Sequence, residues 1–289
     1  MKGVHMLRGW LIYNKKDKQR NQAYIDWFMK EAEKQEIKLI LILREHLQIG
    51  ITKGRHSLTY LDQAIDLPDF AVVRTVEPLL NMHLELLGLK VFNSYEVSNL
   101  CNHKMNTYYA MQKLNIPIMD TLMIKREQLT ENPPRNFPFV VKESTGRGGS
   151  QVHFIQSIDE WIEVLPKFTT EDLVIQSTDV QHGKDLRVFV LGKEIIQAVL
   201  RESKGEFRAN YSLGGIASPY ELSKKEEKLI GKIIHAYDFD LVGIDFLIGH
   251  DGQLILNEIE DVVGSRILSL VSDINLLEKY VIHIKKQFS

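Results

Sequence analysis

The stretch from Phe139 to Ser150 reads FVVKESTGRGGS and places a glycine-rich turn directly after an apolar strand. The strand pattern resumes at Val152 and Phe154, so a strand is expected on each side of the glycines. The stretch lacks the Gly-Lys-Ser/Thr ending of a P-loop, which lies between a strand and a helix. Glycines in a hairpin let backbone N–H groups approach a phosphate, and Lys142 would add a positive charge. A flexible hairpin turn has the same pattern, so this stretch alone does not establish a phosphate site.

Three acidic residues are expected to meet farther along the chain. Glu258 and Glu260 are two positions apart on a predicted strand and therefore point to one face. Asp251-Gly252 lies between two apolar runs and predicts a hairpin. Asp245 lies on the first strand of this hairpin, and the two glutamates lie on the second. Carboxylates that converge repel one another unless a cation lies among them, and oxygen ligands favour Mg²⁺ or Mn²⁺. The alternative is a solvated strand face, which the alternating apolar pattern of both strands disfavours.

Basic residues lie between these two motifs. Arg187 follows Asp185 by two positions, Arg201 ends a predicted strand, and Arg208 precedes Asn210 by two positions. Arginines beside a metal–phosphate centre can neutralise charge that develops on a transferring phosphoryl group. Ordinary salt bridges are the alternative role for each of them.

The first ninety residues alternate predicted strands with predicted helices, which indicates a parallel sheet with helices on its faces. The strands are expected at 9–13, 37–43, 70–73 and 91–92. Arg74 ends the third of these strands, where the ligand crevice of an α/β sheet lies. Arg266 follows the predicted metal-binding strand. Either arginine could pair with a substrate carboxylate, and a structural role is equally open for each.

Composition narrows the class of protein. The chain has 289 residues, with 36 Lys and Arg against 38 Asp and Glu, which argues against broad nucleic-acid binding. The single cysteine, Cys101, excludes an intrachain disulfide and a zinc site built from cysteines. The longest apolar run, at 39–43, is too short to cross a bilayer. We therefore expect a cytoplasmic protein with no nucleic-acid or membrane partner.

In their order along the chain, these motifs resemble the ATP-grasp superfamily, and within it they are most similar to the RimK-like ligases. The resemblance runs from about Asn93 to Ser269. It rests on the segments Asn93-Ser94, His103-Lys104, Val140-Val141-Lys142, 146–150, Asp185-Leu186-Arg187, 207–210, Gly243-Ile244-Asp245 and 257–260. The implied fold combines α/β and α+β parts: an ATP-grasp fold preceded by a parallel α/β (pre-ATP-grasp) domain. The expected segments are that domain at 1–93, a small lobe with the glycine-rich loop at 94–180, and a C-terminal lobe with the metal site at 181–289.

The resemblance also implies roles for single residues. For the phosphates of ATP it implies Lys104, Lys142, Gly146, Gly148, Gly149, Ser150, Arg208 and Asn210. For the adenine hinge it implies Gln176, Ser177 and Thr178, and for the ribose Asp185. Arg187 and Arg208 would be catalytic, and Asp245, Glu258 and Glu260 would hold one or two Mg²⁺ or Mn²⁺ ions. Arg74, Arg201 and Arg266 are the candidates for contact with the substrate.

The implied activity is an ADP-forming carboxylate–amine ligation through an acylphosphate, with a small molecule or peptide as the source of the carboxylate and of the amine. Phosphoryl transfer asks a protein for positioning and charge neutralisation rather than for a covalent nucleophile. Three positions depart from the family pattern: His103 replaces an Asp, Ser177 a Glu, and Glu260 an Asn. A homodimer is suggested by analogy with ATP-grasp ligases alone.

Two other functions stay open at this point. A kinase on the same fold would release a stable phosphoester instead of free phosphate. A non-catalytic nucleotide-binding module would bind ATP without turnover, although such a module has no need of the whole set of Lys142, Arg208, Asp245 and Glu258.

Overall fold

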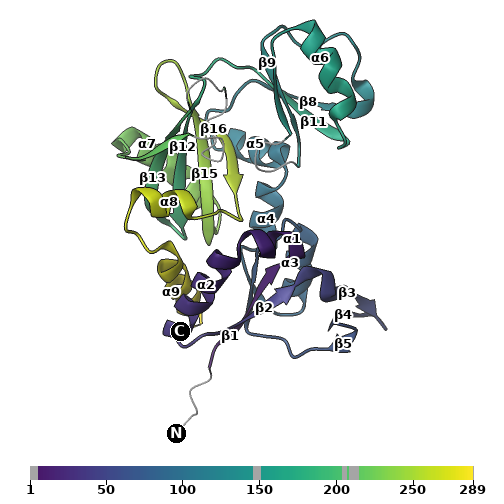
Figure 1. The fold of residues 1–289 in the computed structure, drawn as a ribbon, viewed down its shortest axis with the longest axis vertical. Coiled ribbons are helices and arrows are strands. Elements are labelled where there is room, and N and C mark those ends of the chain that lie inside the picture. The colour runs from purple at the N-terminus through teal and green to yellow at the C-terminus, as the bar shows by residue number, and fades with distance from the viewer. Residues whose placement is uncertain (1–5, 146–150, 204–206, 208–214, 289) are drawn as a thin grey trace.

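The computed structural model describes residues 6–145, 151–203, 207 and 215–288. The described chain forms an elongated body in which the N-terminal domain lies at one end and a small lobe at the other (Figure 1). The C-terminal lobe lies between them. This mixture of one parallel sheet and several antiparallel ones confirms the predicted fold class. Within the described ranges, no helix is long and apolar enough to span a membrane.

The N-terminal domain contains the predicted parallel sheet, with strand order β2-β1-β6-β7. Successive residues of β1 point to opposite faces, so Leu11 packs against one helix layer while Trp10 and Ile12 pack against another. Its strands and helices are β1 (Arg8–Tyr13), α1 (Lys15–Arg20), α2 (Gln22–Lys34), β2 (Lys38–Leu43), β6 (Phe70–Val73), α3 (Pro78–Leu86) and β7 (Lys90–Phe92).

A second, antiparallel sheet projects from this domain and was not predicted. Its strands are β3 (Leu47–Thr52), β4 (Arg55–Tyr60) and β5 (Gln63–Ala64). Most of its side chains are exposed or half-buried; Ile51, for example, is 73% exposed. The hairpin between β3 and β4 turns at Lys53 and Gly54, both with positive φ.

The small lobe is a four-stranded antiparallel sheet, in the order β10-β9-β11-β8, covered by α6. Trp161 of α6 is fully buried and packs edge-on against Phe139 of β9, with ring centroids 5.5 Å apart. The lobe comprises β8 (Thr121–Lys125), β9 (Phe139–Glu143), β10 (Val152–Ile155), α6 (Ile158–Val164) and β11 (Asp172–Gln176).

The C-terminal lobe is a five-stranded antiparallel sheet, in the order β14-β13-β12-β15-β16, with the predicted hairpin between its last two strands. One face packs against α4, α5 and α7 through residues such as Val188 and Ile233. The elements are α4 (Tyr95–Cys101), α5 (Lys104–Lys113), β12 (Lys184–Leu191), β13 (Glu194–Glu202), β14 (Ile216–Tyr220), α7 (Lys224–Ala236), β15 (Leu241–Ile248), β16 (Leu254–Glu260), α8 (Arg266–Val271) and α9 (Leu276–Lys286).

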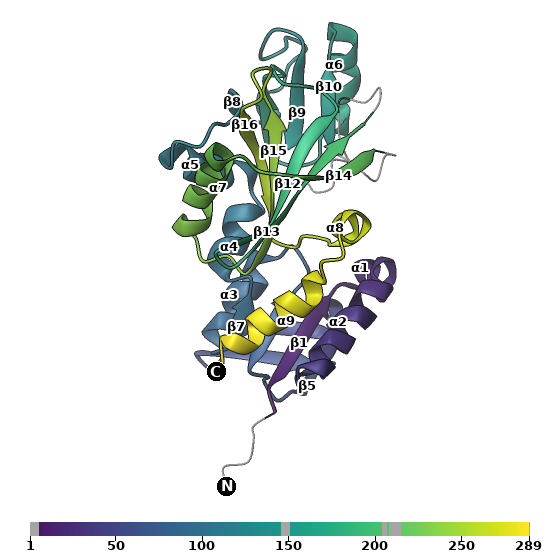
Figure 2. The ribbon, with the colours of Figure 1, turned by 90° about the vertical axis from the view of Figure 1, so that its left-hand side faces the viewer.

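Two of the three predicted segments contain helices that pack on a neighbouring part of the fold. Helix α9, at the C-terminal end, packs along α2 of the N-terminal domain, where Tyr280 meets Phe28 with ring centroids 5.7 Å apart (Figure 2). Helices α4 and α5, which the expected boundaries put in the small lobe, instead pack on the sheet of the C-terminal lobe. The N-terminal domain and the C-terminal lobe therefore share a continuous core.

Asn93 joins the N-terminal domain to the C-terminal lobe. It follows β7, is 4% exposed, and its side-chain Nδ2 donates to the carbonyl oxygens of Leu241 (2.8 Å) and Asp261 (3.0 Å). Its Oδ1 accepts from the backbone N–H of Asp240 at 2.7 Å. These bonds fix the start of β15 and the residue just after β16, the two strands that carry the predicted metal ligands.

We expect Asn93→Ala to lower the free energy of unfolding by roughly 2–4 kcal/mol, because it leaves two buried carbonyls and one buried N–H without a partner. Urea-induced unfolding measures this loss. Asn106→Ala is the matched control: the Asn106 amide donates to the Asn99 carbonyl at an exposed site, and its loss should cost less than about 0.5 kcal/mol. Equal stability of the two variants would contradict the role of Asn93 as the joint.

Candidate active site

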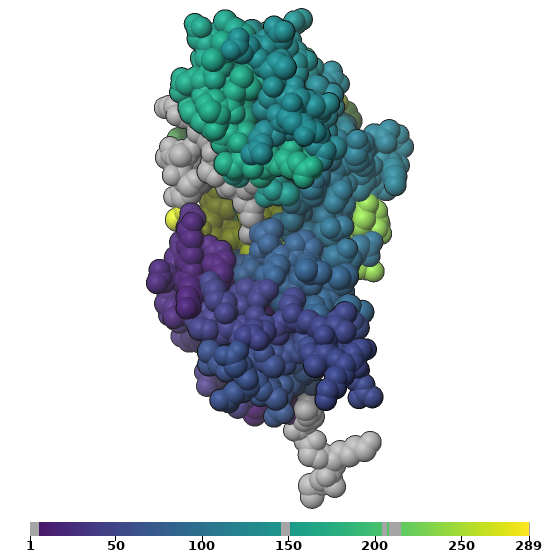
Figure 3. Space-filling view, turned by 90° about the vertical axis from the view of Figure 1, so that its right-hand side faces the viewer, coloured from purple at the N-terminus to yellow at the C-terminus, as the bar shows by residue number. Residues whose placement is uncertain are grey.

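A cavity of about 640 Å³ lies where the small lobe, the C-terminal lobe and the N-terminal domain meet. Figure 3 shows the hollow from outside, with purple α1 at its lower edge and the small lobe above it. Most of the described residues that the sequence singled out line it: Arg74, Lys104, Lys142, Gln176, Ser177, Thr178, Asp185, Arg187, Arg201, Glu258, Glu260 and Arg266. The fold thus brings together residues that are up to 192 positions apart in the sequence, the separation of Arg74 from Arg266 (266 − 74).

Six of the predicted residues lie outside the described part of the chain. They are Gly146, Gly148, Gly149, Ser150, Arg208 and Asn210. Their predicted roles stay predictions. The strands β9 and β10 on either side of the glycine-rich stretch pair antiparallel, with Lys142 opposite Val152.

Two buried lysines lie on the floor of the cavity. Lys142 projects from β9 and Lys104 from the first turn of α5, and they are 7% and 8% exposed. Burial lowers the pKa of Lys142 to about 8, against the opposing attraction of Glu258. Burial also lowers the pKa of Lys104, with Glu258 and Glu143 acting in the other direction. An anion that enters the cavity would therefore stabilise the charged form of both lysines.

The predicted hinge residues follow β11 at the cavity wall. Gln176 is buried, and its Nε2 donates to Thr121 Oγ1 at 2.8 Å. The N–H of Ser177 donates to the carbonyl of Asp120 at 3.1 Å. These bonds tie the end of β11 to the first residue of β8 and to the residue before it, and so hold the cavity wall in place.

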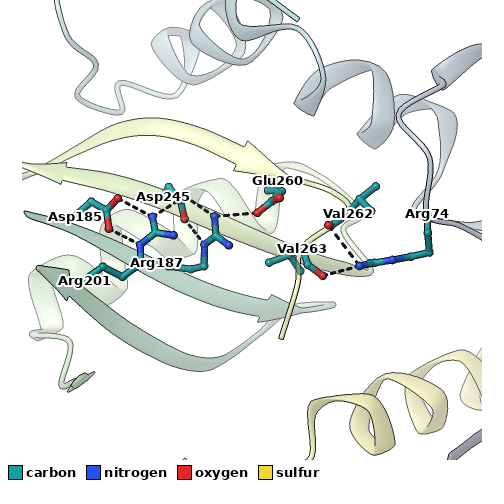
Figure 4. Close-up of polar contacts among 8 residues, drawn as sticks. All are labelled: Arg74, Asp185, Arg187, Arg201, Asp245, Glu260, Val262 and Val263. Carbon is teal, nitrogen blue, oxygen red and sulfur yellow. Dashed lines mark hydrogen bonds and ion pairs between the residues drawn. The ribbon is translucent and has the colours of Figure 1, made fainter. Parts of the chain in front are cut away.

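A chain of ion pairs runs across β13, β12, β15 and β16 (Figure 4). Arg201 pairs with Asp185 and donates to Asp245 Oδ2 at 2.8 Å. Arg187 binds Asp245 through two bonds of 2.7 Å and reaches Glu260 at 2.9 Å. The strand register explains the contacts, because Arg187 lies directly opposite Asp245, and Asp185 opposite Arg201.

This network involves one of the predicted metal ligands, Asp245. Three carboxylates were expected to meet around one cation, but the guanidinium groups of Arg187 and Arg201 occupy both oxygens of Asp245. Burial alone would raise the pKa of Asp245, but these two arginines hold it well below its usual range. Within the described residues, no group of three or more acidic, His or Cys side chains could hold a metal ion. The charge of Asp245 is thus compensated by two arginines in this structure, and its predicted role as a metal ligand stays a prediction.

Glu258 and Glu260 both line the cavity and retain the donor chemistry of a magnesium site. Burial raises the pKa of Glu258, and the nearby Asp245 and Glu260 carboxylates add to the shift. A cation beside Glu258 would relieve this penalty. Mg²⁺ is commonly held by one or two carboxylates together with substrate phosphates and water, so two glutamates suffice to fit the ion.

The three arginines predicted to bind substrate differ in their surroundings. Arg74 is 8% exposed and donates to the carbonyl of Val263 at 3.0 Å, while its guanidinium lies 5.2 Å from the Tyr24 ring centroid. Arg201 belongs to the ion-pair network. Arg266 is exposed at the start of α8. Its Nη2 donates to the carbonyl of Arg20 at 3.1 Å and to Asn21 Oδ1 at 3.0 Å, so all three arginines have protein partners.

Several cavity residues were missed from the sequence. Asn257 precedes Glu258, and its Oδ1 accepts from Lys142 Nζ at 2.9 Å. From the N-terminal domain, Asp17, Arg20 and Asn21 also line the cavity. The position of Asn257 beside the acidic motif was a usable signal. Nothing in the sequence indicated that α1 would face this site.

In a comparison with known protein families, residues 101–284 match the model of the RimK-like ATP-grasp domain. This match confirms the resemblance drawn from the motifs.

The chain is 27% identical over 272 residues to the glutamate–LysW ligase ArgX of Sulfurisphaera tokodaii, covering 90% of this chain and 92% of that one. It is also 27% identical over 251 residues to human N-acetylaspartylglutamate synthase A, covering 80% of this chain but only 63% of the synthase. Among solved structures, the D-alanyl-alanine synthetase A of Vibrio cholerae has a similar fold, with a TM-score of 0.74 at 16% identity over 99% of both chains.

Proposed function

Because this chain belongs to the RimK-like ATP-grasp family, we propose that it joins the carboxylate of an amino acid or peptide to an amine while ATP is cleaved to ADP and phosphate. The chain is an ATP-dependent carboxylate–amine ligase that makes amide bonds. The observation that carries the finer proposal is one cavity that holds two buried lysines, a paired arginine network and two glutamates.

The proposed chemistry has two steps. A substrate carboxylate oxygen attacks the γ-phosphorus of ATP, ADP leaves, and an acylphosphate forms. An amine then attacks the acyl carbon, phosphate departs with the original carboxylate oxygen, and the amine loses a proton as the amide forms. No step needs a covalent bond to the protein, which agrees with a site made of cations and carboxylates.

The residues of the chain would supply position and charge. Lys104 and Lys142 would bind the nucleotide phosphates, and Arg187 would lie near the transferring phosphoryl group. Glu258 and Glu260 would hold Mg²⁺, which when bound neutralises charge on the phosphates. Gln176, Ser177 and Thr178 would contact the adenine. We propose Asp185 and Asp245 as the partners that orient Arg201 and Arg187 rather than as direct ligands of ribose or metal.

Glutamate is the first substrate to test. The relative from Sulfurisphaera tokodaii is named a glutamate–LysW ligase, and the human relative is named a synthase of N-acetylaspartylglutamate. Both names contain glutamate, once as a ligation partner and once within the product. We therefore propose that glutamate, free or at the end of a peptide, is one of the two molecules joined by this chain.

The low pKa of Lys142 predicts a pH dependence. Below a pH of about 8 the free enzyme carries a charged Lys142, and above it the side chain becomes neutral and loses its attraction for phosphate. We expect kcat/KM for ATP to fall as the pH rises through this range, since this ratio reports groups of the free enzyme. Steady-state kinetics across the range measures it.

Lys142→Arg is the matched variant, because a guanidinium stays charged over the whole range. Its kcat/KM for ATP should decline less with pH than that of the parent, whatever its absolute value. Parallel profiles for the two proteins would show that Lys142 does not bind the phosphates.

The experiment for the proposed function is ADP and phosphate release by the purified chain with Mg-ATP. Pairs of amino acids and short peptides, glutamate among them, serve as carboxylate and amine, and mass spectrometry identifies the product. Release that requires both partners supports the ligase. A stable phosphoester without free phosphate would instead identify a kinase.

A further inference from the structure

The sheet of β3, β4 and β5, which projects from the N-terminal domain, has an open edge (Figure 1). Among the residues that the structure describes, β4 is the one strand that pairs with β3, so the other side of β3 has no strand partner there. Proteins commonly protect such an edge with a proline, a bulge or a charged residue within the strand. β3 reads LQIGIT, contains no proline or charged residue, and pairs with β4 in regular register. It can therefore accept another strand.

The hydrogen bonds of this sheet show which residues face the open side. The N–H of Leu61 donates to the carbonyl of His46 at 3.0 Å, so His46 is directed toward the β4 side. Successive residues of an antiparallel strand direct their backbone N–H and C=O to alternate sides. The residues whose groups point to the open side are therefore Leu47, Ile49 and Ile51. The carbonyl of Leu47 accepts from Arg44 Nη1 at 2.8 Å, and a carbonyl keeps a second lone pair for a further donor.

The apolar side chains of these residues change from buried to exposed along β3. Leu47 is 4% exposed, and Ile49 is half-buried against the core of the N-terminal domain. Ile51 follows on the same face of the strand but is 73% exposed. Covering an exposed isoleucine with apolar atoms is favourable, so a strand that pairs with β3 would gain from contact with Ile51.

A second copy of β3 matches this edge when the two strands run antiparallel about an axis at Ile49. Ile49 then lies opposite its own equivalent, and Ile51 lies opposite Leu47 of the second copy. This register joins the outward N–H and C=O groups of one copy to those of the other. It also brings the exposed Lys53, in the turn after β3, toward the exposed Glu45, which precedes β3. Because the axis repeats each contact, the charged pair forms twice.

We propose that two copies of this chain associate through β3, so that their projecting sheets form one continuous antiparallel sheet. The inference is independent of the proposed function. A second copy is the occupant because one register satisfies the backbone groups, the apolar residues and the charged residues of both strands at once. A single strand edge buries less surface than a standard interface, so we expect a dissociation constant of micromolar order.

Sedimentation velocity of the full chain over a series of concentrations tests the association. The parent should pass from monomer to dimer as its concentration rises. We expect Ile51→Asp to weaken dimerisation by roughly tenfold or more, because it brings a carboxylate against the apolar edge of the second copy. Leu270→Asp is the matched control: Leu270 of α8 is 60% exposed and lies outside the projecting sheet, so this variant should dimerise as the parent does.

Disulfide cross-linking tests the register. Gln48 of one copy should lie opposite Gly50 of the other, with Cα atoms about 4.5 Å apart, which a disulfide can span. Both positions are exposed, and a Cβ at Gly50 would meet only Ser57 Oγ, at 3.9 Å. In a Cys101→Ser background, a mixture of the Gln48→Cys and Gly50→Cys chains should therefore form a covalent dimer under oxidation. Either chain alone should not, because its equivalent cysteines are offset by roughly 7 Å along the strand.

The two experiments decide the inference together. A dimer that Ile51→Asp weakens, with a cross-link in the mixture alone, supports pairing through β3. A monomer at every concentration, or a dimer that Ile51→Asp leaves unchanged, would overturn it, and so would cross-linking of each cysteine variant by itself. Circular dichroism melting checks that Ile51→Asp folds as the parent does. If it does not fold, the cross-link in the mixture decides.

Discussion

Glu258→Gln is expected to lower kcat by roughly a thousandfold, the scale for removing a charged group that stabilises phosphoryl transfer. The substitution keeps the shape of a side chain that lies in the cavity among Lys104, Lys142 and the ion-pair network. It removes a negative charge that attracts both buried lysines. Steady-state ADP release measures the effect on turnover.

Binding of Mn²⁺, followed by electron paramagnetic resonance, gives a second readout that does not depend on turnover. We expect Glu258→Gln to weaken Mn²⁺ binding in the presence of ADP. Glu194→Gln, an exposed glutamate of β13, is the control and should match the parent in both assays. Parental Mn²⁺ affinity together with near-parental turnover in Glu258→Gln would remove Glu258 from the proposed metal site.

Arg201→Met should lower the free energy of unfolding by about 3–5 kcal/mol, because it leaves the buried Asp185 carboxylate without its cation and removes one of the two guanidinium groups that bind Asp245. Arg201 is 5% exposed, while Asp185 and Asp245, its two partners, are 6% and 2% exposed. Methionine keeps much of the volume of the side-chain stem, so the expected loss is mainly electrostatic. Urea-induced unfolding provides the measurement.

The control for this variant is Lys184→Met on β12, at the position next to Asp185. Lys184 pairs with Glu202 at 2.7 Å across β12 and β13, but the two side chains are 44% and 40% exposed. An exposed ion pair is screened by water, so Lys184→Met should lower the free energy of unfolding by no more than about 1 kcal/mol. A small effect of Arg201→Met, comparable with that of the control, would mean that Arg201 is free to meet the substrate after all.

Much of the fold could be predicted from local patterns. The apolar runs at 9–13, 37–43 and 70–73 predicted buried parallel strands, and Asp251-Gly252 predicted the hairpin between β15 and β16. The sheet of β3, β4 and β5 escaped prediction because its strands lie mostly at the surface and lack a strong apolar period. The packing of the apolar face of α9 on α2 joins the two ends of the chain, and no local pattern indicated that contact.

The candidate site was predictable in its residue types more than in its contacts. Described lysines, arginines, Asp185 and two glutamates at family positions line one cavity, because motif order reflects the fold. The pairing of Arg187 with Asp245 depends on the register between β12 and β15, which are separated by two strands and a helix in the sequence. That α1 lines the cavity could not be predicted either, because it depends on the contact between the N-terminal domain and α8.

The central claim is that this chain joins a carboxylate to an amine through an acylphosphate, and the most direct test follows the carboxylate oxygen. Glutamate or another carboxylate substrate from the release assay is labelled with ¹⁸O at its carboxyl group, and the phosphate released with Mg-ATP and amine is analysed by mass spectrometry. The account predicts one ¹⁸O atom in each phosphate that accompanies amide formation. Phosphate without the label, or AMP in place of ADP, would contradict it.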